Sequence, residues 1–339
     1  MKPTNTRKKL TLKDVANALS ITPATVSKAL RDSSDISAET KERVKKACDE
    51  LGYRPNLLAR ILTNKKSKIL GVIFPDLRIS FFSEAVRGMY EEATKKGYEC
   101  IFLVHDEDAE KEKQKMEFLS DIGVDGILLN SAGGKKNLKL YKRFSEEGIK
   151  ILSWDRKLED SCFKSVTIDD KKASFELTNK LISQGRKNIL FLGLSSGISV
   201  EIARFEGYKA ALKANSIKFN PNLVIETFRS TKDSYQKMIE VLKNNIKVDG
   251  VISVGGGLST FGAGKAILDQ GLSIPDDIIL SEFGDNDIVS RLGVPFYTVF
   301  QNPYKLGKTA LNMLVKVIEN PKLKDSIQDV QIEYKILQR

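Results

Sequence analysis

The segment LTLKDVANALSITPATVSKAL, residues 10–30, decides the fold at the N-terminal end of this chain. Its first apolar pattern has helical spacing over residues 12–19, and Thr11 stands before it as a cap. After a short turn, Thr22 caps a second pattern in which Pro23 occupies the first helical turn, where proline is best tolerated. The segment therefore predicts two short helices joined by a tight turn.

A third helix is expected to run from Ser37 or Ala38 to Leu51 and to end at Gly52. Three short helices with a tight turn between the first two are typical of a helix-turn-helix, whose second helix enters the major groove of DNA. The exposed face of that helix is polar and carries a single charge, Lys28, which suits the reading of base edges. The alternative is a generic three-helix bundle, because this pattern alone has many false matches.

The positive charge of the chain is concentrated at the same end. Residues 1–68 contain 16 Lys and Arg and 7 Asp and Glu, a balance of +9, whereas the other 271 residues contain 39 and 37, a balance of +2. A clustered basic region is the electrostatic footprint of a protein that binds the phosphate backbone of nucleic acid. Charge and helix pattern together favour a DNA-binding head on a nearly neutral body.

The composition argues against several other classes of protein. The 339 residues are enough for two or three domains, and they include no apolar stretch near the roughly 20 residues of a membrane helix. The N-terminus lacks the apolar core of a signal peptide, so we expect a cytoplasmic protein that does not enter a membrane. Three separated cysteines and a single histidine, His105, argue against a disulfide framework, a metal site or a histidine-based triad. We expect no cofactor.

From residue 69 onward, apolar strand patterns alternate with amphipathic helix patterns, which predicts parallel, doubly wound α/β sheets. The run is long enough for two such sheets. Strands are expected at residues 69–74, 100–104, 126–130, 149–154, 165–168, 188–192, 224–227, 250–254 and 278–283. The expected helices include residues 81–96, 171–184, 203–214, 232–245, 259–270 and 303–319.

Motifs of nucleotide-binding enzymes are incomplete in this body. The three glycines at residues 255–257 lack the last glycine of a G-x-G-x-x-G loop, and Gly264-Lys265 lacks the first glycine of a P-loop. Loop carboxylates such as Glu107 and Asp170 are expected to be solvated rather than paired as a general acid and base. The sequence therefore favours a protein that is not an enzyme.

Three stretches, L-T-L-K-D-V-A, T-P-A-T-V-S-K-A-L and L-G-Y-R-P-N-x-x-A-R-x-L, resemble the DNA-binding region of the LacI/GalR family of bacterial transcriptional regulators. The resemblance continues to near the C-terminus. It implies an all-α helix-turn-helix domain at residues 1–55, a hinge helix and linker at 56–68, and a two-lobed core like type I periplasmic binding proteins at 69–339. Lobe one would cover about 69–166 and 302–326, and lobe two about 167–301 and 327–339.

The resemblance also assigns roles to residues of the head. Pro23, Ala24 and Lys28 would stand at base-reading positions, with Thr25 and Ser27 nearer the phosphates. The predicted DNA-binding residues are Thr11, Thr22, Pro23, Ala24, Thr25, Ser27, Lys28, Tyr53, Asn56, Ala59, Arg60 and Leu62.

A hinge helix is implied at residues 56–63, where Leu62 would insert into the minor groove at the centre of the operator, with Arg60 beside the groove. Such a wedge unstacks a base step and yields a bent duplex that contacts more protein. The alternative for Leu62 is an ordinary leucine on a linker helix. Because so short a helix is marginal in water, we expect it to form only on DNA.

The family's ligand cleft is implied between the two lobes. Asp155 and Arg204 are the leading candidates there, because a carboxylate and a guanidinium can bind sugar hydroxyls in a bidentate manner. Phe81, Phe82 and Trp154 could contact a sugar ring, although core packing is the alternative for each. The predicted ligand-binding residues are Asp76, Ser80, Phe81, Phe82, Trp154, Asp155, Arg204, Gly257 and Asp285.

Three positions depart from the family pattern. Residues 256–257 are both glycine where many relatives carry Asn-Asp, and Gly284 stands where many carry Asp. Three explanations remain open at this point. The ligand could differ from a simple sugar, Asp285, Asn286 and Ser253 could compensate, or the cleft could have lost its small molecule.

The resemblance thus implies a homodimeric regulator, by family habit a repressor, that binds a pseudopalindromic double-stranded operator and responds to a carbohydrate effector. The lobes would form the dimer, in part through residues that follow Phe74 and the helix around residues 81–90. One rival is the solute-binding protein of a sugar transporter, which would need export and would not carry the head. A DNA-acting enzyme such as a recombinase is another, but it would need a nucleophile or metal carboxylates.

Overall fold

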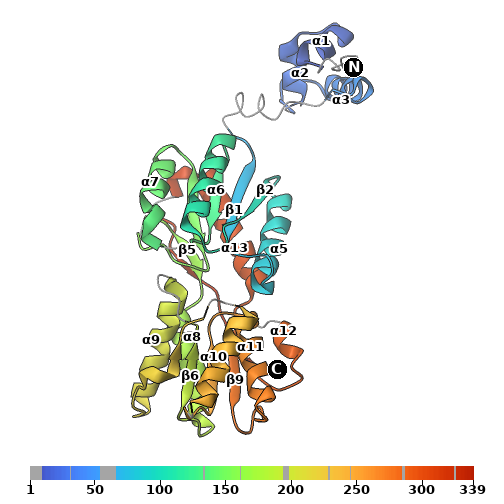
Figure 1. The fold of residues 1–339 in the computed structure, drawn as a ribbon. Coiled ribbons are helices and arrows are strands. Elements are labelled where there is room, and N and C mark those ends of the chain that lie inside the picture. Colours follow the sequence, from blue (N-terminus) through green and yellow to red (C-terminus); the bar gives the residue numbers. More distant parts are fainter. Residues whose placement is uncertain are drawn as a thin grey trace, which may run out of the picture. The chain divides into compact units, whose positions relative to one another are not determined.

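The computed structural model describes residues 10–30, 32–53, 66–132, 134–160, 162–193, 198–227, 230–244, 246–284, 287–323 and 326–339 (Figure 1). The chain divides into two compact units, Met1–Ser67 and Lys68–Arg339. We call the first unit the head and the second the body, and we treat each by itself.

In the part of the head that the structure describes, the chain forms the three helices that the sequence predicts. They are α1 (Leu12–Leu19), α2 (Pro23–Leu30) and α3 (Ala38–Leu51). Local hydrogen bonds fix their first turns: Thr22 Oγ1 accepts the Thr25 N–H at 3.1 Å, and Ser37 Oγ accepts the Thr40 N–H at 3.2 Å. These bonds satisfy N–H groups that have no partner within the helix. The head packs around buried Val15, Ala16, Val26, Ala29, Val44, Ala47, Cys48 and Tyr53.

The body contains two six-stranded sheets, each with its own helices (Figure 1). The first sheet is parallel throughout and has the order β11-β5-β4-β3-β1-β2. Its strands are β1 (Ile69–Phe74), β2 (Glu99–Val104), β3 (Gly126–Leu129), β4 (Lys150–Trp154), β5 (Ser165–Thr167) and β11 (Val330–Gln331). Its helices are α5 (Ser80–Lys95), α6 (Ala109–Ile122), η1 (Gly134–Asn137), α7 (Leu138–Glu146), α13 (Pro303–Glu319) and η3 (Pro321–Leu323).

The second sheet has the order β12-β10-β9-β8-β6-β7, and only β12 is antiparallel to its neighbour. Its strands are β6 (Ile189–Leu192), β7 (Val224–Ile225), β8 (Gly250–Ser253), β9 (Ile279–Phe283), β10 (Tyr297–Phe300) and β12 (Lys335–Gln338). Its helices are α8 (Asp170–Ser183), α9 (Ser199–Ala214), η2 (Pro221–Leu223), α10 (Thr231–Lys243), α11 (Gly257–Asp269) and α12 (Asp287–Ser290). Two doubly wound α/β sheets, the predicted architecture, are confirmed.

The chain passes between the two lobes three times, after β5, β10 and β11. The family resemblance implies lobe changes near residues 167 and 301, and the first two passages follow Thr167, the last residue of β5, and Phe300, the last residue of β10. The third lies later than the expected change at residue 327, because β11 pairs with β5 through Val330 and Val166. Residues 330–331 therefore belong to lobe one, and only β12 returns the chain to lobe two.

Lobe one depends on a close approach between α5 and α13. A Cβ atom at Gly307 would lie 2.0 Å from the carbonyl oxygen of Ala85, and one at Gly88 would lie 2.3 Å from that of Tyr304. Glycine at both positions lets the two backbones touch.

In the described parts of the chain, no helix is long and apolar enough to span a membrane.

Candidate nucleic-acid interface and ligand cleft

The predicted reading face of the head is accessible. Thr22, Pro23, Ala24 and Lys28 are exposed, Thr25 and Ser27 are half-buried, and Thr11 is exposed ahead of α1. The opposite side of α2 is closed, because Val26 and Ala29 pack into the core of the head. A polar face on a helix that is fixed from behind is what base reading in the major groove requires.

Lys28 has an intramolecular partner in this structure. Its Nζ lies 2.5 Å from Asp35 Oδ2, and about half of each side chain is exposed. Hydrogen bonds from Lys28 and then Ser33 lower the pKa of Asp35 to about 2, so the carboxylate is charged at neutral pH. Exposed ion pairs contribute little to stability. Lys28 can therefore exchange Asp35 for a phosphate or a base edge at small cost.

Five predicted DNA contacts need separate mention. Tyr53 is only 8% exposed, because its ring packs into the core of the head and its N–H donates to Cys48 O at 2.8 Å. The structure therefore places it behind the reading face. The remaining four lie outside the described residues: Asn56, Ala59, Arg60 and Leu62.

The body contains a cleft at the carboxyl ends of its parallel strands, which is where ligands bind in open α/β sheets. Phe81 reaches it from α5 in lobe one, Asp155 follows β4, and Arg204 belongs to α9 in lobe two. The cavity is small, ≈ 50 Å³. Its lining is Ile79, Phe81, Phe82, Asp155, Arg156, Val200, Arg204, Val254, Gly255, Gly256, Phe283, Gly284 and Gln301.

Four of the predicted ligand-binding residues meet in this cleft: Phe81, Phe82, Asp155 and Arg204. Of the other predicted residues that the structure describes, none is among the lining residues. Trp154 is fully buried beneath it, with its ring 5.9 Å from that of Phe82 in an edge-on contact. Asp76 instead binds Arg78, with Oδ2 2.7 Å from Nη2. Ser80 begins α5, Gly257 is a buried first residue of α11, and Asp285 lies outside the described residues.

Arg204 is held by a buried carboxylate that sequence reasoning took for a solvated one. Its Nε donates to Asp170 Oδ1 at 2.7 Å, and the two side chains are 7% and 8% exposed. Nη1 donates to Val254 O at 3.3 Å, and the guanidinium lies 4.1 Å from the centre of the Phe283 ring. Burial raises the pKa of Asp170 to about 6 although Arg204 opposes the rise. The pair joins α8 to α9 at the wall of the cleft.

Asp155 occupies a strained turn. Its φ is 61°, and the Arg156 N–H donates to Trp154 O across it at 2.6 Å, which makes a γ-turn of the rare, positive-φ kind. The Asn130 amide donates to Asp155 Oδ2 at 2.9 Å. Strained backbone of this type persists only where the surroundings hold it, and it gathers at functional sites.

Arg156 is buried and doubly bound. Its Nη1 and Nη2 donate to the two carboxylate oxygens of Glu107 at 2.7 and 2.6 Å, and Nη1 also donates to Ser131 O at 2.8 Å. The interpretation of Glu107 as a solvated loop carboxylate was therefore wrong, because the folded chain brings Arg156 to it from 49 residues away. This planar, two-bond pairing is the strongest geometry for a guanidinium and a carboxylate.

Sequence reasoning missed Asp170, Asn130, Gln301 and Phe283 as parts of this site. Asn130 directly follows β3, and Gln301 directly follows β10, at the carboxyl edge where ligand sites gather. Asn130 ends the strand expected at residues 126–130, so that rule could have found it, whereas no strand was expected before Gln301. Asp170 carries no such signal, since its role depends on the approach of α9.

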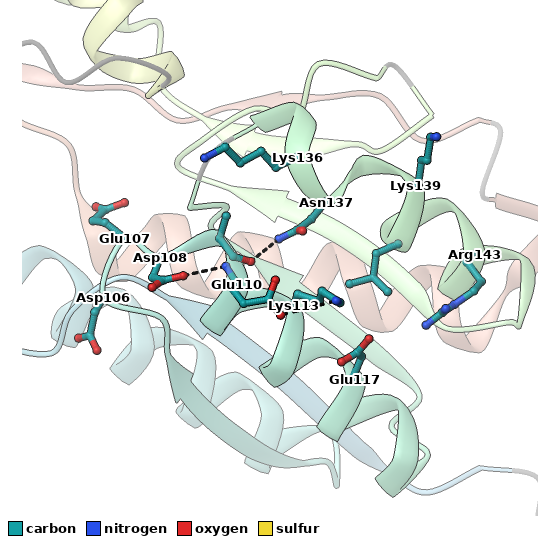
Figure 2. Close-up of a pocket in the computed structure, with 12 residues that line it drawn as sticks. Asp106, Glu107, Asp108, Glu110, Lys113, Glu117, Lys136, Asn137, Lys139 and Arg143 are labelled. Carbon is teal, nitrogen blue, oxygen red and sulfur yellow. Dashed lines mark hydrogen bonds and ion pairs between the residues drawn. The ribbon is translucent and has the colours of Figure 1, made fainter.

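A wider groove, ≈ 1060 Å³, lies on lobe one beside α6 and α7 (Figure 2). It presents acidic side chains such as Glu110 and Glu117 and basic ones such as Lys139 and Arg143 to solvent. Lys113 and Glu110 lie 3.6 Å apart as an exposed ion pair. Such mixed charge is ordinary for a solvated surface, so the cleft between the lobes is the better ligand site. In the described residues, no cluster of His, Cys, Asp or Glu suits a metal ion.

Comparison with known proteins agrees with this architecture. The profile of bacterial regulatory proteins of the lacI family matches residues 11–56, and that of periplasmic binding proteins and the sugar-binding domain of the LacI family matches residues 67–339. The HTH-type transcriptional regulator RegA of Clostridium saccharobutylicum is 31% identical, with 97% of this chain and 98% of RegA covered. Catabolite control protein A of Staphylococcus aureus strain Mu50 is 27% identical, with 96% and 98% covered.

Solved structures give the same result for the fold. A Lac repressor dimer bound to operator and the anti-inducer ONPF has a TM-score of 0.85 at 22% identity, covering 97% of this chain and 98% of that one. A complex of the transcriptional regulator CelR with cellobiose has a TM-score of 0.71 at 21% identity and the same coverage. With a regulatory profile on its head and a sugar-binding profile on its body, the chain belongs to the LacI family of bacterial regulatory proteins.

Proposed function

We propose that this protein is a homodimeric transcriptional repressor whose affinity for a pseudopalindromic operator is set by a sugar or sugar derivative bound between its lobes. The observation that carries the proposal is the coexistence of two sites on one chain. One is an exposed polar face on α2, and the other is a two-lobed cleft whose charged side chains come from both lobes.

The DNA-binding half rests on the head. Pro23, Ala24 and Lys28 are accessible for base edges, with Thr25 and Ser27 beside them for phosphates. Two heads on a twofold axis would read two half-sites, and Leu62 from each would enter the minor groove between them. The Lac repressor dimer solved on its operator has the same fold, which supports this arrangement.

The ligand-binding half rests on the cleft. Asp155 accepts and Arg204 donates hydrogen bonds, and the rings of Phe81 and Phe82 offer apolar surface, a combination that suits a polyhydroxylated ring. The cavity of ≈ 50 Å³ is far smaller than the roughly 300–1,000 Å³ of pockets that hold drug-sized ligands. A ligand must therefore part the lobes or displace a side chain. The complex of CelR with cellobiose supports a carbohydrate.

Lobe movement gives the cleft its effect on the head. A ligand changes operator affinity only by binding one lobe arrangement better than the other. The protein acts by binding alone, without catalysis, in the cytoplasm where its DNA lies. The head argues against a solute-binding protein of a transporter, which needs no DNA-reading helix.

A gel shift of the full chain with DNA from upstream of its own gene tests this proposal. We expect a discrete complex that survives excess bulk DNA and whose midpoint shifts with one member of a panel of sugars. Thermal unfolding with the same panel should identify that sugar independently, because a ligand of the folded state raises its stability. A complex that bulk DNA removes at once would contradict the DNA-binding half, and a panel without any shift would contradict the effector half.

A further inference from the structure

His105, the single histidine of the chain, directly follows β2. Its side chain is fully buried, Nε2 lies 2.8 Å from Asn130 O, and Nδ1 accepts the backbone N–H of Glu107 at 3.1 Å. Because Nδ1 accepts a hydrogen bond, the ring proton resides on Nε2, which donates to Asn130. The imidazole is therefore neutral and bonded at both nitrogens.

Both residues bonded to this ring also hold a residue of the cleft. The side-chain amide of Asn130 donates to Asp155 Oδ2 at 2.9 Å. The carboxylate of Glu107 accepts two bonds from Arg156, at 2.6 and 2.7 Å. Asp155 and Arg156 are neighbours in the chain, and both line the cleft. One buried ring thus lies behind both charged residues that lobe one contributes to the cleft.

These bonds act on a turn that needs support. Asp155 has a φ of 61° within a γ-turn, a conformation that costs energy unless contacts hold it. Its N–H donates to Val166 O at 2.9 Å, which fixes one side of the turn. The Asn130 and Glu107 side chains hold the other groups of the turn, and Figure 2 shows Glu107 on the loop between Asp106 and Asp108, ahead of α6.

The surroundings of the ring favour its neutral form. Burial lowers the pKa of His105, and Arg156 from beyond β4 lowers it further, although the Asn130 carbonyl, Glu112 from α6 and Glu107 from its own loop raise it. A second proton would place an N–H at Nδ1 against the N–H of Glu107, two donors in contact. The buried Glu112 carboxylate already accepts hydrogen bonds from Ala132 N, Asn137 Nδ2 and Tyr141 Oη.

We propose that His105 is a positioning residue of the ligand cleft: its neutral imidazole sets Asn130 and Glu107, which in turn orient Asp155 and Arg156. This inference rests on the proposed function of the cleft as the effector site. It gives a structural role to the single histidine of the chain, whose side chain is fully buried.

Two substitutions separate the two bonds of the ring. In His105→Asn, the amide oxygen can take the place of Nδ1 and accept from Glu107, but the side chain is too short for Asn130. In His105→Gln, the amide nitrogen can reach Asn130, but the acceptor for Glu107 is displaced. His105→Phe removes both bonds. Thr178→Val is the matched control, because Thr178 is also fully buried and also donates to a backbone carbonyl, that of Ser174 at 2.7 Å.

Trp154 reports on the turn without any ligand, because it is the only tryptophan and adjoins Asp155. We expect acrylamide to quench its fluorescence about twofold more strongly in His105→Phe than in the wild type, since the turn opens more often. The Asn and Gln variants should fall between, and Thr178→Val should match the wild type. Equal quenching in His105→Phe and Thr178→Val would overturn the proposal.

The protonation state of His105 can be measured on the wild type, so the proposal remains testable even if His105→Phe does not fold. The single imidazole gives one pair of nitrogen signals in a long-range proton–nitrogen NMR spectrum of the full chain. We expect the Nε2–H form, unchanged from pH 8 to pH 6, whereas a free histidine titrates near about 6.5. A proton on Nδ1, or ordinary titration near that pH, would overturn the proposal.

Sugar binding to the wild type and to His105→Phe distinguishes a failure of the positioning role of His105 from a failure of the proposed effector site. With cellobiose and glucose as probes, thermal shift should give about tenfold weaker binding for His105→Phe, the effect of one misplaced hydrogen bond. If neither sugar shifts the wild type, the effector class is at fault, and quenching and NMR still decide the positioning role. If a sugar binds the wild type and His105→Phe equally, the positioning role is contradicted.

Discussion

Each of the two arginines that line the cleft is paired with a carboxylate that holds its guanidinium group. Arg204 is fixed by Asp170, and Arg156 is fixed by Glu107. Removal of one partner leaves an uncompensated buried charge, which costs more than the pair contributes. The second members of the pairs therefore matter as much to ligand binding as the residues that touch the ligand.

Arg204→Ala should abolish the response to any effector while DNA binding without effector remains. It should also lower the free energy of unfolding by about 3–5 kcal/mol, because Asp170 stays buried without its partner. Thermal shift with the sugar panel and gel shift of the same preparation check both parts. An unchanged effector midpoint would clear Arg204 of this role.

The pH dependence of stability should reveal His105. Its pKa is lowered in the folded chain, so the unfolded chain binds the proton more readily. Stability is then fully present above about pH 6.5, the ordinary value, and falls as the pH drops below it, by up to about 1.4 kcal/mol per pH unit. Urea unfolding of the wild type and His105→Gln from pH 8 to pH 5 measures this difference. Parallel curves for the two proteins would contradict the prediction.

Residue roles were predictable from the sequence only where a motif carries them. Asp155 and Arg204 stand in motifs of the family, and the structure brings both to the cleft. Asp170, Glu107 and His105 stand in no motif, and their pairing depends on contacts across 34, 49 and 25 residues. Periodicity and local spacing contain no information about such contacts.

The described helices of the head lie where the sequence predicts them, because their ends are coded locally. Ser37 caps α3, and Gly52 ends it with a φ of 70°. In the body, β10, β11 and β12 were not predicted, because their pairing with β9, β5 and β10 is nonlocal. β7 is shorter than expected for the same reason, since only Val224 and Ile225 find partners on β6.

The close packing of helix α5 on helix α13 leads to a prediction about the stability of the protein. Gly307→Ala places a methyl group 2.0 Å from the backbone oxygen of Ala85, so the helices must separate. We expect a loss of about 1–3 kcal/mol in the free energy of unfolding, measured with urea. Lys308→Ala, a change at a partly exposed neighbour, is the control and should cost far less. Equal stability of Gly307→Ala and wild type would contradict the close approach.

The hinge helix implied at residues 56–63 leads to a second prediction about an element of the chain. Leu62→Ala should weaken binding to the operator far more than binding to bulk DNA, because only a specific complex uses the wedge. Competition gel shifts with both DNAs measure the two affinities. An equal loss in both would contradict the wedge and leave Leu62 as an ordinary linker residue.

At the scale of the whole molecule, charge and ligand binding are divided between two units. The head carries most of the net positive charge, and the nearly neutral body carries the cleft. Because cation–phosphate contacts release counterions, operator affinity should fall about a thousandfold or more between 50 and 200 mM salt. A titration of affinity against salt measures the slope, and a flat line would contradict the electrostatic part of the account.

Three passages of the chain join the two lobes of the body. A change in the arrangement of the lobes therefore involves all three connections. Regulation requires only that the ligand prefers one arrangement, and the narrow cleft shows that this arrangement leaves a sugar little room. Under the proposed function, a sugar therefore changes operator affinity through the balance between lobe arrangements.

The most direct test of ligand-controlled DNA binding is fluorescence anisotropy with the full chain. The labelled DNA comes from upstream of its gene and is titrated against bulk competitor DNA, with and without the sugar panel. We expect a preference for one site of about a thousandfold or more at moderate salt, and a shift in that preference with one sugar. Equal affinity for that DNA and for bulk DNA, whatever sugar is present, would contradict it.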